Sequence, residues 1–216
     1  MKQIIAVLFR PWLLLRRTLD EKTMSPDPIA QFARWYSWAR RCLWLEFPDA
    51  MHLSTVHQDG GPDGRMVLLK DFGPDGFVFF TNYSSAKGAE LALNPQAALT
   101  FYWDALGWQV RVRGIVEKVS AAESDQYFAT RPRASQIGAW SSNQSQVIES
   151  REELIKKIEK FTETFKGQQI TRPTNWGGFR LAPESIEFWQ LAPSRLHDRI
   201  RYRKEQGAWI RERLCP

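Results

Sequence analysis

Short apolar runs separated by turn residues dominate the middle of the chain. The runs Met66 to Leu69 and Phe77 to Phe80 are joined by a segment that contains Gly73 to Gly76, with the sequence GPDG. Apolar runs of this length are typical of buried strands, and glycine, proline and aspartate between them favour a tight turn. The pattern therefore predicts a β-hairpin at this point.

The other strands are predicted by alternation of apolar and polar residues or by similar apolar runs. One strand is expected from Ala50 to His57. A second, longer hairpin is expected from Ala97 to Trp103 and Trp108 to Val119, joined by Asp104 to Gly107. Shorter strands are expected at 178–181, 186–191, 200–202 and 209–214.

Helices are predicted between these strands, each beginning at a residue that can cap the first turn. The expected cap residues are Asp27, Ser84 or Ser85, Ser120 and Ser150. The first of these helices carries an apolar stripe typical of a core-facing helix, formed by Ile29, Phe32, Trp35, Tyr36, Ala39 and Leu43. Short antiparallel strands with interposed helices predict a mainly β fold with α insertions, arranged as a barrel.

Residues 1–26 differ in character from the rest of the chain. The apolar runs Ile4 to Phe9 and Trp12 to Leu15 are interrupted by Arg10 and Pro11, so each is too short for a membrane span or a signal-peptide core. We expect an N-terminal arm here, which is a mobile arm, a surface-docked segment or an upstream extension. A single domain is expected over residues 27–216, with no membrane association.

Composition narrows the class of protein further. With 216 residues, of which 43% are hydrophobic, the chain is long enough to bury one substantial core. The two cysteines, Cys42 and Cys215, show no metal-binding or redox spacing, so we expect no metal and a cytoplasmic protein. The net charge of +6 fits binding of phosphorylated small molecules or of nucleic acid.

The central stretch carries cations that suggest an anion site. Arg65 and Lys70 flank the run Met66 to Leu69, and Lys87 follows the serines that cap a predicted helix. A capped helix start beside a lysine favours an anion. Arg65 and Lys70 would lie on opposite faces of a regular strand, so a bulge or a strand end is needed to aim both at one ligand. The alternative is two solvated charges flanking a buried strand.

Two other clusters of polar residues are candidates for binding. Tyr127 and Arg131 are spaced i and i+4 near a helix end, with Ser135 shortly after, and together they suit a phosphate. The alternative is an arginine that completes a helix C-terminus. In the second cluster, strand alternation would place Arg195, His197 and Arg199 on one side, which favours a binding role.

An ordered set of motifs in this chain resembles the pyridoxine/pyridoxamine 5′-phosphate oxidase family. The motifs are RMVLLK, FFTN with the later Lys87, WQVRV, YFATRPRASQIGAW, NQS, WGGF, EFWQ and RLHDR. Each motif alone is weak, but their order and near-constant spacing extend from about Asp27 to the C-terminal ERLCP.

The resemblance implies an FMN-binding split β-barrel that forms a homodimer with its flavin at the subunit interface. The FMN-binding positions would be Arg65, Met66, Val67, Leu68, Leu69, Lys70, Phe80, Thr81, Lys87, Gln109, Gln144, Ser145, Trp189 and Arg199. The substrate-binding positions would be Lys70, Tyr127, Arg131, Ser135, Arg195, Leu196 and His197. Among these, Arg195 and His197 would lie at the reacting carbon as catalytic residues that orient the substrate and act electrostatically.

The implied reaction oxidises pyridoxamine or pyridoxine 5′-phosphate to pyridoxal 5′-phosphate by hydride transfer to FMN, with oxygen as the final acceptor and peroxide as product. The chain departs from the family pattern at Ala86, at Trp108 and in its N-terminal arm. One alternative is therefore a flavin protein or pyridoxal-phosphate carrier with little oxidase activity. The other is a barrel that binds nucleic acid through Arg201, Arg203, Arg211 and Arg213.

Overall fold

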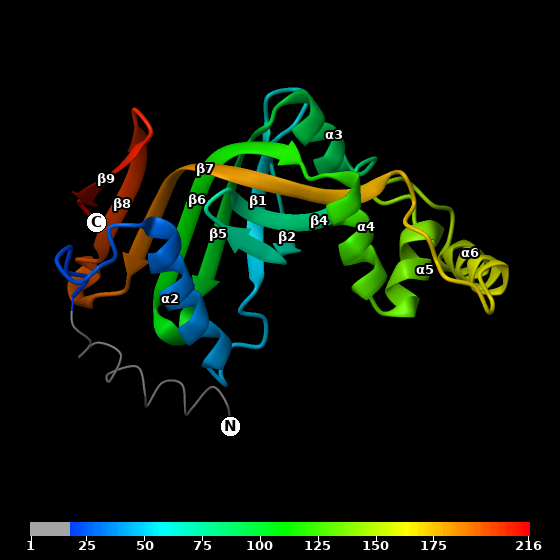
Figure 1. The fold of residues 1–216 in the computed structure, drawn as a ribbon, viewed down its shortest axis with the longest axis horizontal. Helices are drawn as coiled ribbons and strands as arrows, with labels where there is room; N and C mark the ends of the chain where they lie inside the picture. Colours follow the sequence, from blue (N-terminus) through cyan, green and yellow to red (C-terminus); the bar gives the residue numbers. More distant parts are fainter. Residues whose placement is uncertain (1–17) are drawn as a thin grey trace.

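The computed structural model describes residues 18–216 and contains one nine-stranded antiparallel sheet with helices packed against it (Figure 1). The strands are β1 (Ala50–Val56), β2 (Pro62–Leu68), β3 (Asp71–Gly73), β4 (Gly76–Asn82), β5 (Gln96–Trp103), β6 (Trp108–Lys118), β7 (Trp176–Gln190), β8 (Asp198–Glu205) and β9 (Ala208–Leu214). The α-helices are α2 (Pro28–Arg41), α3 (Ala86–Leu93), α4 (Ala121–Thr130), α5 (Arg133–Ser141) and α6 (Arg151–Thr164). Short 3₁₀ turns span Asp104–Leu106 and Pro193–Arg195.

The sheet closes on itself through the covalent chain. The strand order is β2-β1-β5-β6-β7-β4-β3, so β2 and β3 lie at opposite ends of the path. Only Leu69 and Lys70 separate these two strands in the sequence, and the Lys70 N–H continues the β3–β4 pairing by donating to the Val78 carbonyl at 2.9 Å. The seven strands therefore form a barrel, which β8 and β9 extend from β7.

The longest strand, β7, pairs with three neighbours: β6, β4 and β8. A β-bulge interrupts its pairing with β6, because Arg113 lies opposite Ser185 whereas Gly114 lies opposite Pro183. A Cβ atom at Gly114 would lie only 1.9 Å from the Ala182 carbonyl oxygen, so this position requires glycine. The bulge allows one continuous strand to bend around the barrel.

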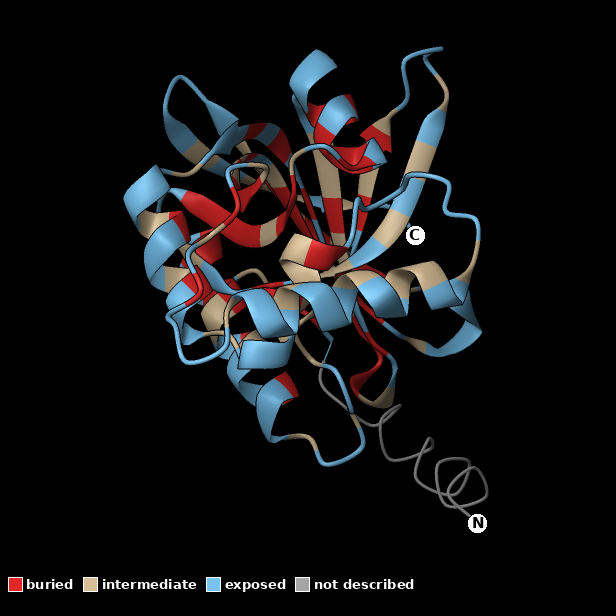
Figure 2. Ribbon diagram, turned by 90° about the vertical axis from the view of Figure 1, so that its right-hand side faces the viewer, coloured by how far each residue is buried: buried red, intermediate tan, exposed pale blue. Residues whose placement is uncertain are grey.

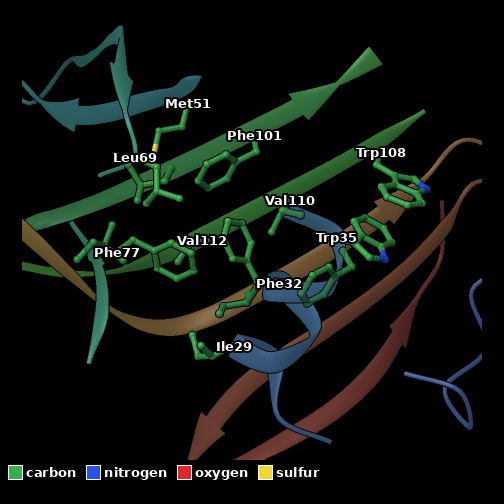
Figure 3. Packing of buried hydrophobic residues seen from close by; sticks show 14 of the residues in the cluster. Ile29, Phe32, Trp35, Met51, Leu69, Phe77, Phe101, Trp108, Val110 and Val112 are labelled. Atoms are coloured by element: carbon green, nitrogen blue, oxygen red, sulfur yellow. The ribbon is translucent and has the colours of Figure 1, made fainter. Parts of the chain in front are cut away.

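Helix α2 supplies the aromatic centre of the main core. Phe32 is fully buried and lies 4.9 Å from the rings of both Phe72 and Phe77 and 5.0 Å from Phe101. One turn along the helix, Trp35 stacks on Trp108 at 4.4 Å (Figure 3). The helix begins at Pro28 because the Asp27 carboxylate accepts the Ile29 N–H, and its apolar face then packs against the inside of the sheet.

A smaller core lies under the helices at the other end of β7. Phe128 of α4, Ile137 of α5, Ile170 and Trp176 form its buried centre. Helix α6 buries none of its residues completely, although Phe161 packs against this cluster. Figure 2 shows this end of the molecule, where mostly exposed and intermediate helices lie against buried strands.

Most predicted elements are confirmed. The structure is mainly β with α insertions, the long β5–β6 hairpin is present, and the capped helices begin after Asp27, Ser85, Ser120 and Ser150. These features depend on signals within a few residues of one another, which is why the sequence predicts them well.

Three expectations about strands are wrong. The turn at Gly73 to Gly76 does form a hairpin, but the strand that pairs with β4 there is the short β3, while β2 pairs with β1. The run Met66 to Leu69 is not a buried strand, because β2 ends the sheet path and turns Met66 (61% exposed) and Leu68 (41% exposed) outward. The two strands predicted at 178–191 are a single strand, since the bulge continues the pairing through Pro183.

The predicted N-terminal arm is described only from residue 18 onward. Leu19 and Met24 are buried, and the Leu19 N–H donates to the Asp198 carboxylate at 3.1 Å. The Tyr202 hydroxyl donates to the Ser25 carbonyl at 2.7 Å. Residues 19–25 therefore lie on β8 and β9, and the expectation for residues 1–17 falls outside the described residues. Within residues 18–216 no helix is long and apolar enough to cross a membrane.

The central position of Phe32 generates a stability prediction. Phe32→Ala should lower the free energy of unfolding by about 3–5 kcal/mol, because it removes a fully buried ring and leaves a cavity in the aromatic centre of the core. Phe47→Ala is the control, since that ring is 63% exposed. Urea denaturation of both variants is the measurement, and similar losses in the two would contradict the proposed core.

Candidate active site

A cleft with a volume of about 810 Å³ lies between the barrel and the helices α4 and α5. Its walls come from β2 and β4 on the barrel side, from the helix start of α3, and from α4, α5 and the segment after α5. Its lining residues are Arg65, Met66, Val67, Leu68, Lys70, Phe80, Thr81, Asn82, Lys87, Tyr127, Thr130, Arg131, Pro132, Ser135, Gly138, Ala139, Ser142, Gln144 and Trp176.

Arg65 is fixed at the barrel side of this cleft. Its Nη2 lies 2.9 Å from the carboxylate of Glu90, whose side chain is only 4% exposed, and also pairs with Asp63. Its Nη1 donates to Thr55, whose hydroxyl in turn donates to the same Glu90 oxygen. The guanidinium is therefore held by three side chains from β1, β2 and α3.

Lys87 lies in the first turn of α3 and is 8% exposed. Burial lowers the pKa of its amine, and the nearby positive charge of Arg65 lowers the pKa further. Its Nζ donates to Gln144 at 3.2 Å, and Gln144 also accepts from Thr81 at 3.1 Å. Two cations close together beside a helix start form a site that favours an anion.

Arg131 forms a second cationic point in the same cleft. It is the residue at which α4 ends, and its Cζ lies 4.5 Å from the ring centroid of Trp176. Burial lowers the pKa of its guanidinium. Among the described residues its buried Nη1 has no hydrogen-bond partner. A buried donor without an acceptor is costly, so an anionic ligand at this point would be stabilised.

Tyr127 and Ser135 line the cleft beside Arg131. Tyr127 stacks on Phe80 with their ring centroids 3.9 Å apart. Ser135 lies in the first turn of α5, a helix that the sequence analysis missed because it begins after Pro132 without a side-chain cap. The proposed trio of phenol, guanidinium and hydroxyl is therefore brought to one wall.

Lys70 lines the same cleft as Arg65 because β2 ends at Leu68. The strand end thus provides the change of direction that the sequence analysis required. Lys70 also forms an ion pair with Asp49 at 3.3 Å. Leu69 differs from its neighbours, since its side chain is 4% exposed and lies in the main core (Figure 3).

The other predicted site residues form a separate row across β6, β7 and β8. Gln109 lies opposite Trp189, and Trp189 lies opposite Arg199. Arg199 pairs with Glu187 at 2.8 Å, which raises the pKa of the guanidinium. His197 lies 4.7 Å from the Trp189 ring, and its Nδ1 accepts the Ala192 N–H.

The expected alternation of Arg195, His197 and Arg199 along one strand is wrong. Strand β8 begins only at Asp198, and Arg195 lies in a 3₁₀ turn with a positive φ of 61°. Arg195 and Leu196 are exposed. Ser145, another predicted residue, is also exposed and has a positive φ of 71°. These residues are thus presented on loops and not by a regular strand.

Within one chain, the cleft and the row lie far apart. Trp176 lines the cleft and Trp189 belongs to the row, and both are on β7. Thirteen residues of extended strand span about 40 Å. Figure 1 agrees, since α4 and α5 lie at one end of the sheet and β8 at the other.

Comparison with known proteins gives a consistent picture. Residues 43–165 match the family model described as pyridoxamine 5′-phosphate oxidase, and residues 176–216 match the model of the pyridoxine 5′-phosphate oxidase C-terminal dimerisation region. The chain is 52% identical over 217 residues to a pyridoxine/pyridoxamine 5′-phosphate oxidase of Gloeothece citriformis, covering 100% of both chains. It is 53% identical to that of Microcystis aeruginosa, covering 94% of each.

Among solved structures, PhzG from Burkholderia lata 383, in complex with tetrahydrophenazine-1-carboxylic acid, superposes with a TM-score of 0.86 at 27% identity, covering 92% of this chain and 98% of that chain. An FMN-binding protein from Nostoc punctiforme shares the fold, with a TM-score of 0.70 at 20% identity, covering 89% and 100%. The fold is therefore that of the FMN-binding split β-barrels. The chain belongs to the pyridoxine/pyridoxamine 5′-phosphate oxidase family.

The structure adds contacts that the sequence analysis did not predict. Glu90 and Thr55 hold Arg65, and Trp176 contacts Arg131. Helical spacing on α3 offered a signal for Glu90, because it follows Lys87 by three residues and shares its face. Thr55 offered no such signal, since its contact with Arg65 depends on strand pairing.

Glu90 generates a prediction about stability. Glu90→Gln keeps the side-chain volume but removes the buried negative charge between Arg65 and Lys87. In cofactor-free protein it should lower the free energy of unfolding by up to about 3 kcal/mol, because the buried Lys87 and the partly buried Arg65 lose a buried counter-charge.

The matched control is Asp63→Asn, which removes the other carboxylate that contacts Arg65. The Asp63 side chain is 44% exposed, so this change should cost less than about 1 kcal/mol. Thermal and urea unfolding of both variants measure the difference, and equal effects would show that burial of Glu90 does not matter.

Proposed function

We propose that this protein is an FMN-dependent oxidase that converts pyridoxamine and pyridoxine 5′-phosphate to pyridoxal 5′-phosphate and releases hydrogen peroxide. One observation carries the proposal: a single cleft contains two cationic points, one at Arg65 and Lys87 and one at Arg131. FMN and the substrate each bear one phosphate. The Nη1 of Arg131, which has no partner within residues 18–216, and the two adjacent cations of the other point suit this pair of ligands.

FMN would be held mainly by the barrel side of the cleft. Arg65, Lys87 and the start of α3 offer donors for its phosphate, with Thr81 and Gln144 beside them. The exposed side chains of Met66 and Leu68 offer an apolar wall for a flat ring system. When bound, FMN would supply the two-electron redox chemistry that oxidises the 4′ carbon of the substrate, with oxygen as the final acceptor.

The substrate phosphate would be bound by Lys70, Tyr127, Arg131 and Ser135. These side chains hold one end of the pyridine compound, and so fix its distance from the flavin and reduce the entropy cost of reaction. Arg195 and His197 would orient the reacting end and act on developing charge. The contacts of His197 with the Trp189 ring and the Ala192 N–H would fix the orientation of its imidazole.

The site would be completed by a second copy of the chain. The C-terminal residues that match a dimerisation region carry the row with Trp189, His197 and Arg199. Because that row lies far from the cleft of its own chain, we propose a homodimer in which each row covers the cleft of the partner. Leu196, Gln109 and Ser145 would then contribute at the same interface.

The alternative of a nucleic-acid-binding barrel has less support from the structure. Arg201 and Arg203 both pair with Glu212, at 2.7 Å in each case. Arg213 pairs with Glu21 and Asp198, and the pKa of Glu21 is lowered to about 2 by that contact. These charges are compensated within the chain and offer less attraction to a phosphate backbone. A flavin protein or pyridoxal-phosphate carrier would use the same cleft, and the absorption experiment below distinguishes it from an oxidase.

An absorption spectrum tests the proposed reaction. In purified protein loaded with FMN, the flavin absorbance should fall on anaerobic addition of pyridoxamine 5′-phosphate. It should return when air is admitted, and peroxide should form. A flavin spectrum that persists after substrate addition would favour the carrier. Protein that does not take up FMN would contradict both.

Subunit complementation tests how the site is assembled. Arg131→Ala in one chain and His197→Ala in the other should each give a weak enzyme. Random mixing of the two chains should restore about a quarter of wild-type activity, because half the dimers are mixed and each of those has one intact site. If both residues act from one chain, mixing restores no activity.

A further inference from the structure

Trp176 is a buried aromatic residue of the cleft to which neither the motifs nor the proposed function gives a role. We propose that Trp176 is a positioning residue, which holds the Arg131 guanidinium ready for the substrate phosphate. The inference rests on the proposed function, since it concerns the same phosphate. It adds a residue that acts through Arg131.

The contact between the two side chains is a cation–π interaction. Arg131 Cζ lies 4.5 Å from the Trp176 ring centroid and 5.5 Å from the ring of Phe128. A cation over the face of an indole is attracted by the ring electrons. The guanidinium carries its N–H donors at its edges, so a ring can hold it and still leave donors for a ligand.

Comparison with Arg65 shows why this arrangement matters. The guanidinium of Arg65 is held by the carboxylates of Glu90 and Asp63 and by the Thr55 hydroxyl, which use its N–H donors and its charge. Arg131 keeps an unused, buried donor at Nη1 among the described residues. A ring therefore fixes Arg131 without an acceptor that would compete with phosphate.

Trp176 is itself well fixed. It is 6% exposed, begins β7, and pairs across the sheet with Asn82. Its ring is nearly parallel to those of Phe80 and Tyr127, at interplanar angles of 13° and 7°. The barrel thus sets the position of Arg131 at the end of α4, through a stack of rings that also includes Tyr127.

The first test is ligand affinity. In FMN-loaded enzyme, Trp176→Leu should weaken binding of pyridoxal 5′-phosphate by about tenfold and raise the KM for pyridoxine 5′-phosphate similarly, with a smaller change in kcat. Trp176→Phe, which keeps a ring, should retain most of the affinity. Pyridoxal, which lacks the phosphate, should bind equally to wild type and variant, whereas a general disturbance of the cleft would weaken both ligands.

Trp140→Leu is the matched control. Trp140 belongs to the same small core, but its ring packs on Phe161 and Phe165, at 5.8 and 5.4 Å. The substitution should lower stability and leave the affinity for pyridoxal 5′-phosphate unchanged. Equal losses of affinity in the Trp140 and Trp176 variants would overturn the inference.

A double-mutant cycle decides whether Trp176 acts through Arg131. In an Arg131→Ala background, Trp176→Leu should cause no further loss of affinity for pyridoxal 5′-phosphate. Additive losses would overturn the inference while leaving the proposed function intact. If Arg131→Ala alone has no effect, the phosphate assignment in the proposed function fails instead. Should Trp176→Leu not fold, the same cycle is measured with Trp176→Met, which adapts better to the apolar site.

Discussion

The backbone pairing of β7 is the constraint on which both the fold and the site depend. This strand pairs with β4 near Trp176 and with β6 and β8 near Trp189. It therefore joins β6 to β4 in the barrel, contributes Trp176 to the cleft, and carries Trp189 of the distant row. The bulge opposite Gly114 keeps the strand continuous while it bends, so the cleft and the row of one chain are joined through a single strand.

The cleft shows two ways to hold a partly buried arginine near an anion site. At Arg65 a buried carboxylate compensates the charge, which stabilises the protein but also partly neutralises the cation. At Arg131 an aromatic ring holds the guanidinium, and the charge stays available. In the proposed function the first point serves a cofactor that stays bound. The second serves a substrate that must arrive and a product that must leave.

Local signals in the sequence were sufficient for the helices but not for strand partners. Asp27, Ser85, Ser120 and Ser150 cap helices as predicted because a cap involves only its own first turn. The pairing of β2 with β1 depends on barrel closure, which no local pattern encodes, and so the exposure of Met66 was missed.

The candidate site shows the same division between local and distant effects. The motifs identified residues that the fold brings to one cleft, namely Arg65, Lys70, Lys87, Tyr127, Arg131, Ser135 and Gln144. The motifs did not include Glu90, which holds Arg65 from α3, and they gave no role to Trp176 of the WGGF motif, which contacts Arg131. The alternation argument for Arg195 failed because it assumed a strand, whereas Ser194 and Arg195 have positive φ angles.

The exposed walls of the cleft and the separate row have one common explanation. In the proposed homodimer the partner's row on β6 to β8 would cover the surface where Met66 is 61% exposed beside two cationic points, because the aromatic and basic groups of each row lie too far from the cleft of their own chain.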